Sequence, residues 1–141
     1  MMKKIILKII LIFIFTISVL SAKTDFFNEG VNLFNNKKFE EARFKFEQNI
    51  VYNPKSEQSY LYLSKIFNKL EKKELEEQNL NTVMLINPKN EEAIYNLAKL
   101  KLSSSDYEKS RKLNEKLSLI CNKFCTKNKK LKVEIENLSK K

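Results

Sequence analysis

The side chains best suited to chemistry in this chain are its two cysteines, Cys121 and Cys125, which three residues separate. A metal site is disfavoured because the chain has no histidine and no second cysteine pair to complete a ligand set. A redox pair more often has two intervening residues. Positions four apart on a regular helix lie near the upper limit of disulfide Cα separation, so a bridge forms more easily where the helix ends between them. We predict a disulfide that stabilises by at most about 2 kcal/mol, with two free, partly buried thiols as the alternative.

No other group of residues has the composition of a catalytic site. The chain has no histidine and a single glycine, so it lacks both the commonest general base and a glycine-rich phosphate loop. Its paired carboxylates, at 76–77 and 91–92, are neighbours in sequence, and neighbouring residues of a helix do not face one another. We predict that the protein is not an enzyme and uses no cofactor.

The formal net charge of +10 could attract anionic lipid, nucleic acid or an acidic protein. Acidic residues are interleaved with the lysines over most of the chain, and only the stretch 123–132 is distinctly basic, with five lysines and no acid. Phe124 is the one aromatic residue there that could stack on a base, so we predict no nucleic-acid partner. A weak electrostatic contact of this stretch with a membrane surface stays open.

Residues 1–21 have the layout of a secretory signal. Lysines precede an apolar run over 9–20, and side chains of small or modest size follow at its end. The run is shorter than the roughly 20 residues that cross a bilayer comfortably. We predict that the signal is cleaved, that the mature chain begins at Ala22 or Lys23, and that the protein is periplasmic or secreted. Amino-terminal sequencing of the exported form that returned Met1 would contradict this, and an uncleaved inner-membrane anchor is the alternative.

The elements that must position these residues recur with a period of about 34 residues, the length of one helical-hairpin repeat. Pro54 and Pro88 are separated by one such period, and each closes an apolar run and opens a polar one. Side chains of similar size recur with the same shift. They are Phe26, Tyr60 and Ile94 at a bulky position and Gly30, Ser64 and Ala98 at a small one. A small residue is what a helix needs where a neighbouring helix crosses it closely, so the repeat predicts stacked helices.

Apolar residues at helical spacing, with only one glycine and two prolines, predict an all-α fold and disfavour turn-rich β architecture. Ser56 and Asn90 follow the two proline turns, and each is placed to cap the next helix. The predicted helices span 24–36, 39–53, 56–70, 73–87, 90–103, 106–122 and 127–139.

With these residues the chain resembles the tetratricopeptide repeat family, whose pattern is a large residue, a leucine and a small residue, an aromatic, then alanine, phenylalanine and a closing proline. The first copy matches through Phe26, Gly30, Leu33, Phe39, Ala42, Phe46 and Pro54. The second has Lys73 and Glu76 where a bulky and a small residue are expected, so its second helix is expected to be shifted or shortened. The third has Lys101 at the aromatic site and ends at Asn122 without proline.

The resemblance implies an α-solenoid of about three helix-turn-helix hairpins plus a C-terminal capping helix. The repeats occupy 22–122, at about 23–56, 57–90 and 91–122, and a basic capping helix occupies 123–141. About three stacked copies are the usual minimum for a stable solenoid. Leu131, Ile135 and Leu138 form one narrow apolar stripe in the last segment, which suits a terminal helix. The cysteine pair is similar to cysteines that close the last repeat in some bacterial exported repeat proteins.

In repeats of this class the first helix of each hairpin lines the concave side, so the resemblance implies a groove for a partner. Its candidate residues are Phe27, Val31 and Phe34, then Leu61, Lys65 and Asn68, and then Tyr95, Lys99 and Leu102. This mixture suits an extended or helical peptide with apolar anchors and an acidic group. The alternative is that several of them, Phe27 and Leu61 especially, pack against neighbouring helices.

Some members of the family grip a terminal carboxylate with lysine and asparagine on these first helices. The corresponding positions here are Phe27, Val31, Tyr62, Glu92 and Asn96, so that activity is not expected. We therefore expect a non-catalytic scaffold of the bacterial cell envelope that binds a protein or peptide partner. The alternative is a peripheral membrane-surface protein that uses the basic C-terminal helix, with membrane contact through that helix or an uncleaved signal.

Overall fold

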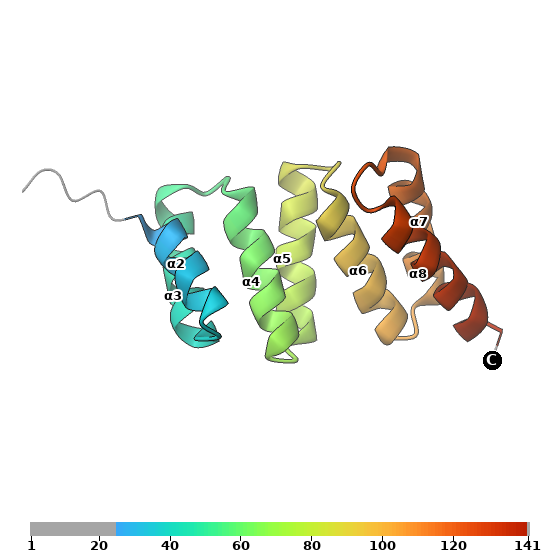
Figure 1. The fold of residues 1–141 in the computed structure, drawn as a ribbon, viewed down its shortest axis with the longest axis horizontal. Helices are drawn as coiled ribbons and strands as arrows, with labels where there is room; N and C mark the ends of the chain where they lie inside the picture. The colour runs from blue at the N-terminus through green and yellow to red at the C-terminus, as the bar shows by residue number, and fades with distance from the viewer. Residues whose placement is uncertain (1–24, 141) are drawn as a thin grey trace, which may run out of the picture.

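The computed structural model describes residues 25–140, and over that range the chain is all-α, as predicted (Figure 1). Seven helices follow one another: α2 (Phe26–Asn35), α3 (Phe39–Tyr52), α4 (Glu57–Lys69), α5 (Lys73–Ile86), α6 (Glu91–Ser103), α7 (Tyr107–Ile120) and α8 (Cys125–Leu138). None of these helices is long and apolar enough to cross a membrane. The predicted signal over 1–21 lies outside the described residues.

Consecutive helices pack in antiparallel pairs, α2 with α3, α4 with α5 and α6 with α7, and the pairs stand side by side in one row (Figure 1). α8 packs against α7 and α6 at the end of that row. The turns within the pairs, at 36–38, 70–72 and 104–106, lie along one long edge, which we call the hairpin edge. The connections between successive pairs, at 53–56, 87–90 and 121–124, lie along the opposite edge, which we call the repeat edge.

The backbone of the hairpin edge repeats with the same period as the sequence. Lys37, Glu71 and Ser105 all have a left-handed conformation, with φ of 60°, 57° and 61°. In each turn the next residue donates its N–H to a carbonyl in the last turn of the preceding helix, over 2.9 to 3.0 Å. This pattern closes the helix C-terminus and satisfies carbonyls that would otherwise have no partner.

The predicted caps on the repeat edge are confirmed. The Ser56 hydroxyl accepts a hydrogen bond from the Ser59 N–H at 3.4 Å, and the Asn90 side chain accepts one from the Ala93 N–H at 2.7 Å. Both bonds satisfy an amide in the first turn of the following helix. The turns that contain proline therefore end one helix and start the next.

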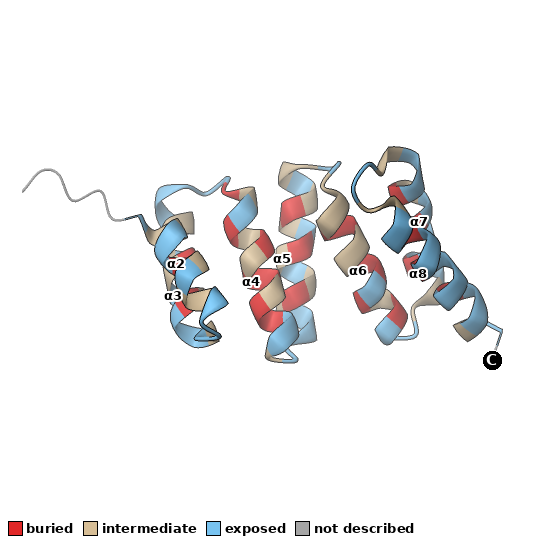
Figure 2. Cartoon of the chain, in the orientation of Figure 1, coloured by how far each residue is buried: buried red, intermediate tan, exposed pale blue. Residues whose placement is uncertain are grey.

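The core lies between the helices and consists of two clusters (Figure 2). One joins α3 and α4 around Phe46, which has no exposed surface. The other runs from α4 through α8 and ends at Leu131 and Ile135. A Cβ atom added to Gly30 would lie 2.9 Å from the Phe46 ring, which explains the small residue at that position. Every buried residue of both clusters lies beyond 41, so a chain that begins at Ala22 keeps the whole core.

The expectation that the second helix of the second pair is shifted or shortened was wrong. α5 spans Lys73–Ile86, the same length as α3 and α7. Lys73 is exposed at its first position, and Glu76 is buried at the crossing with α4. The Asn68 amide donates to both oxygens of the Glu76 carboxylate, at 3.2 and 3.1 Å. This partner from α4 lets a carboxylate occupy a position where the family pattern has a small side chain.

Candidate functional site

A groove of about 710 Å³ crosses the concave side of the row. Its walls come mainly from α4 and α6, the first helices of two pairs, with contributions from the end of α2 and the start of α5. Five of the nine residues predicted for a partner groove line it. They are Phe34, Lys65, Asn68, Tyr95 and Lys99. The structure thus brings together predicted residues from all three pairs of helices.

The other four predicted residues do not line this groove. Leu61 and Leu102 are only 3% and 6% exposed and belong to the larger core cluster, so their assignment to the groove was wrong. Both leucines pack in the core between helices, which the family resemblance alone did not distinguish from the side that lines the groove. Phe27 and Val31 pack, partly buried, against the core cluster around Phe46.

An aromatic cluster occupies the position beside the groove where a carboxylate clamp would lie. The Phe27 ring packs edge-on against Tyr62 at 5.9 Å between centroids, and the Phe34 ring does so at 5.2 Å. Tyr62 in turn stacks on Phe46 at 4.8 Å. These rings hold the start of the groove rigidly, but they supply no cation for a terminal carboxylate.

The groove is lined by four lysines and by three glutamates, Glu71, Glu76 and Glu92, so it keeps a small excess of positive charge. Lys65 on α4 forms an ion pair with Glu92 on α6, at 2.8 Å between Nζ and Oε1. Lys69, Lys73 and Lys99 also line the groove, and within residues 25–140 no acidic oxygen lies within ion-pair distance of their ammonium groups. These three lysines can therefore bind acidic groups of a ligand.

Glu76 supplies a buried carboxylate to the groove. It is 5% exposed, and burial raises its pKa above the usual value, although the hydrogen bond from Asn68 and the charge of Lys73 act in the opposite direction. Sequence reasoning missed this role, because the only signal was a carboxylate at a position that normally holds a small residue. Such a group can accept a hydrogen bond from a ligand N–H.

Replacing Glu76 with glutamine is expected to stabilise the protein at neutral pH. A raised folded-state pKa means that Glu76 favours the fold most below its unfolded pKa, near 4.5, and that this contribution is lost as the pH rises through the folded pKa. Glutamine resembles the protonated acid at every pH. Urea unfolding should therefore show a gain for Glu76→Gln that is larger at pH 7 than at pH 4. The matched control is Glu74→Gln, an exposed position on α5, and an equal gain at both pH values would contradict the assignment.

The start of α8 packs against Tyr95, one of the residues that line the groove. The Phe124 ring lies 5.5 Å from the Tyr95 ring, and the Lys127 ammonium lies 4.5 Å from the Phe124 centroid and 5.7 Å from that of Tyr95. Phe124, the residue considered above for base stacking, therefore packs against α6. Its position on Tyr95 links the C-terminal segment to the groove.

Glu91 fixes the loop that contains the cysteines. Its carboxylate accepts hydrogen bonds from the N–H groups of Lys123 at 3.0 Å and Phe124 at 2.8 Å. Backbone hydrogen bonds, the largest from Asn122 and the next from Phe124, lower the pKa of Glu91. This carboxylate holds the connection before α8, which begins at Cys125, two residues before the predicted start. Glu57, at the same position one repeat earlier, likewise accepts hydrogen bonds from the Asn87 and Asn90 side chains of the connection between α5 and α6.

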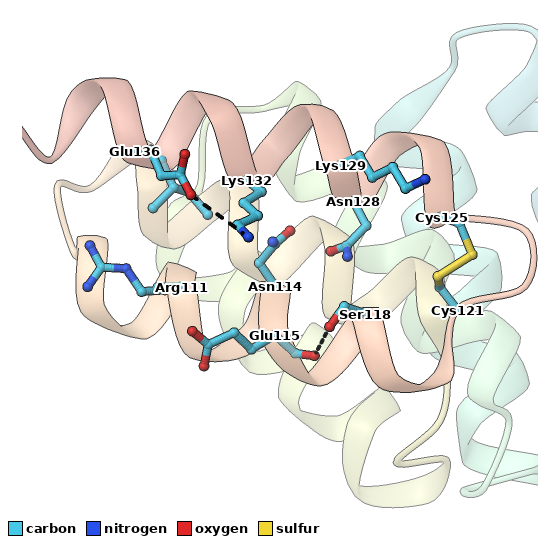
Figure 3. A pocket seen from close by; sticks show the side chains of 11 residues that line it. Arg111, Asn114, Glu115, Ser118, Cys121, Cys125, Asn128, Lys129, Lys132 and Glu136 are labelled. Carbon is cyan, nitrogen blue, oxygen red and sulfur yellow. Dashed lines mark hydrogen bonds and ion pairs between the residues drawn. A yellow bond between two sulfur atoms is a disulfide. The ribbon is translucent and has the colours of Figure 1, made fainter.

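The Cα atoms of Cys121 and Cys125 are 5.2 Å apart, within the roughly 4.4–6.8 Å range of disulfides, and Figure 3 draws the sulfur atoms joined. α7 ends at Ile120 and α8 begins at Cys125, so the pair spans a break between helices, as the disulfide prediction required. Residues 25–140 contain no group of three or more histidine, cysteine, aspartate or glutamate side chains placed to hold a metal ion.

A second, smaller pocket of about 390 Å³ lies between α7 and α8 (Figure 3). Asn114 from α7 and Asn128 from α8 project into the space between the two helices, and the Oδ1 atom of each is buried without a hydrogen-bond partner in the part of the chain described. Lys132 borders this pocket at the position that corresponds, one repeat later, to the small residue Ala98. An exposed lysine there prevents another helix from crossing α8 as closely as α7 crosses α6.

No protein-family model and no curated protein sequence matches the chain. Several solved structures of tetratricopeptide repeat domains share its fold. The chaperone SycD of Yersinia enterocolitica type III secretion, in complex with a peptide of the translocator YopD, superimposes with a TM-score of 0.73 at 16% identity, over 82% of this chain and 92% of that one.

Two further structures contain bound peptides or partners. The first tetratricopeptide repeat domain of Spaghetti (RPAP3), bound to the HSP90 peptide SRMEEVD, gives a TM-score of 0.68 at 16% identity, over 79% of this chain and 90% of that one. The TPR2B domain of yeast Sti1, in a complex with pHsp70, gives 0.71 at 14% identity, over 78% and 92%. At these identities the likeness shows the fold, and the chain has the tetratricopeptide repeat fold that its residues resemble.

Proposed function

We propose that this chain is a non-catalytic scaffold of three tetratricopeptide hairpins, closed by α8, that binds a peptide segment of another protein in its concave groove. The observation that carries the proposal is the groove between α4 and α6, which has aromatic side chains from α2 and α6 and three lysines with no carboxylate of residues 25–140 within ion-pair distance. Such a surface recognises an extended peptide by its side chains and by its main-chain polar groups.

The groove indicates the chemistry of the peptide. Lys69, Lys73 and Lys99 favour at least one acidic side chain, and the rings of Phe34 and Tyr95 favour apolar or aromatic anchors. The amide groups of Asn68 and Asn96 line the same groove and can bond the peptide main chain. A peptide that combines acidic and apolar residues is therefore the best match.

The structural neighbours support peptide binding as the use of this fold, because three of them were solved with a peptide or a partner bound. The mode of binding proposed here differs from a carboxylate clamp. The five clamp positions of this chain are occupied by Phe27, Val31, Tyr62, Glu92 and Asn96, which include one acid and no lysine. We therefore assign recognition to internal acidic and apolar side chains of the peptide.

Selection from a displayed library of random dodecapeptides tests this proposal. The chain that begins at Ala22 serves as bait, and enriched peptides are expected to carry an acidic residue within a few positions of an aromatic or aliphatic one. Their binding should weaken as salt rises, because the acid contact is partly exposed. Failure to enrich any peptide, or enrichment of basic peptides, would contradict the proposed groove chemistry.

We further propose that the chain acts in the cell envelope with Cys121 and Cys125 joined as a disulfide. The predicted signal over 1–21 supports export, and an oxidising compartment lets a disulfide persist. Alkylation of the native exported protein without reductant, followed by mass spectrometry, should then label neither cysteine. Two alkylated thiols would contradict the bridge and leave the hydrogen bonds of Glu91 as the main constraint on the loop.

A further inference from the structure

Three aliphatic side chains lie exposed at the same register of the repeat. Val51, Leu85 and Leu119 occupy the last turns of α3, α5 and α7, one in each successive pair of helices, and are 75%, 83% and 86% exposed. Each of these helices ends at the repeat edge (Figure 1). Single exposed aliphatic residues are ordinary, but their recurrence in every pair at one edge forms a row that the fold itself leaves uncovered.

A row of lysines accompanies the aliphatic row. Lys55, Lys89 and Lys123 follow the three aliphatic residues by four positions, with the same period, and all three are exposed. Within residues 25–140 none of their ammonium groups lies within ion-pair distance of a carboxylate. The repeat edge therefore presents an aliphatic side chain and a free cation from each successive connection.

The three connections of this edge contain no acidic residue, although the exposed Asp25 caps α2 at the same edge. The segments 48–56, 82–90 and 116–124, which build it, contain no aspartate or glutamate. Of the acids that flank these segments, Glu57 and Glu91 are turned into the connections, where they accept hydrogen bonds from Asn90 and Phe124 respectively. The hairpin edge differs, because acids such as Glu71 lie in or next to its turns. The charge and the apolar surface thus coincide on one edge only.

Aromatic residues extend this edge toward the first helix. The Phe26 ring at the start of α2 stacks on the Tyr52 ring at the end of α3, at 5.5 Å between centroids, and Tyr52 is 78% exposed. Aromatic rings of this kind favour the boundary between lipid and water. The chain also enters α2 here, so an uncleaved anchor over 1–21, the alternative stated above, would hold this edge toward the bilayer.

We propose that the repeat edge docks on an anionic membrane surface. The aliphatic side chains enter the interface between headgroups and acyl chains, and the three lysines contact lipid phosphates. A membrane presents phosphates and an apolar layer along its whole surface, which suits a row that repeats the same aliphatic and basic side chains. The edge does not overlap the groove, which α4 and α6 form on the concave side, so a membrane-bound chain keeps its groove free for a peptide.

Vesicle sedimentation tests the proposal with the chain that begins at Ala22, so that residues 1–21 cannot contribute. Wild type is expected to bind mixed vesicles of phosphatidylcholine and phosphatidylglycerol and to release them as salt rises. Since each lysine near such a surface contributes roughly fivefold in affinity, replacing Lys55, Lys89 and Lys123 with glutamine should weaken binding by about a hundredfold. The matched control replaces Lys37, Lys72 and Lys109, near the hairpin edge, with glutamine and should change binding by less than about fivefold.

A second measurement locates the contact. The chain has no tryptophan, so Leu85→Trp reports only on the repeat edge. Its fluorescence should shift to shorter wavelength with anionic vesicles and be quenched by brominated lipid, whereas Ser104→Trp at the hairpin edge should show neither change. The proposal would be overturned by equal loss of binding in the two triple-lysine variants, by the absence of binding of wild type, or by equal quenching of both tryptophans. Absence of vesicle binding would assign the edge to a protein partner instead.

Discussion

Replacing Phe46 with alanine is expected to lower the unfolding free energy by about 3 to 5 kcal/mol, the largest effect of a single substitution in this chain. The Phe46 side chain is fully buried on α3. It fills the space over Gly30, stacks on Tyr62 and packs edge-on against Phe27 at 5.8 Å. Alanine would leave a cavity among rings that are fixed by their other neighbours. A domain of this size has roughly 5 to 15 kcal/mol of stability, so the variant should unfold at a markedly lower urea concentration.

The control for this prediction lies two residues away. Phe44 is on the same helix but is 56% exposed, and Phe44→Ala should change the unfolding free energy by less than about 1 kcal/mol. Urea titrations followed by circular dichroism measure both variants. Similar destabilisation by the two substitutions would show that the helix, and not the packing over Gly30, determines stability there.

Reversing the charge of Lys99 is expected to weaken binding of an acidic library-selected peptide by at least about tenfold, which corresponds to about 1.4 kcal/mol. Lys99 lines the groove without an ion-pair partner among the described residues, so Lys99→Glu removes an attraction and adds a repulsion. Lys65→Glu and Tyr95→Ala also change residues that line the groove. The structure makes both less specific, because Lys65 pairs with Glu92 and Tyr95 supports Phe124.

Lys130→Glu is the matched control for Lys99→Glu. It makes the same change of charge at an exposed position of α8 outside the groove, and it should alter the dissociation constant by less than about threefold. Fluorescence anisotropy with a labelled peptide compares the two. Equal weakening by both variants would mean that the peptide responds to net charge, and equal binding by wild type and Lys99→Glu would remove this lysine from the site.

The fold could be predicted from the sequence because its determinants recur. The same local sequence signals recur in successive copies, and each has the same structural consequence. They are Pro54 and Pro88, the small residues at 30, 64 and 98, and the caps at Ser56 and Asn90. The error at α5 arose where one copy departs from the pattern. Glu76 is accommodated by Asn68, eight residues earlier on another helix, and such a partner cannot be identified from the pattern of one helix.

The site was only partly predictable, because lining a groove depends on where neighbouring helices sit. The family resemblance placed Lys65, Asn68 and Lys99 on the side where the groove lies. It also placed Leu61 and Leu102 there, although they pack into the core. Contacts between separate helices, such as the pair of Lys65 with Glu92, leave no local signal in the sequence. The exposed row at the repeat edge could not be predicted from the sequence either. Val51, Leu85 and Leu119 are aliphatic like core residues, and only the structure shows that they are exposed.

The proposed function requires that a peptide binds in the groove between α4 and α6. Titration of isotope-labelled chain with a selected acidic peptide, followed by the backbone amide resonances, tests it most directly. Saturable shifts are expected that are largest at Ser64, Asn68, Asn96 and Lys99, with little change at Leu85 or Asn128. Largest shifts along the repeat edge or in the pocket between α7 and α8, with the groove amides unchanged, would contradict it.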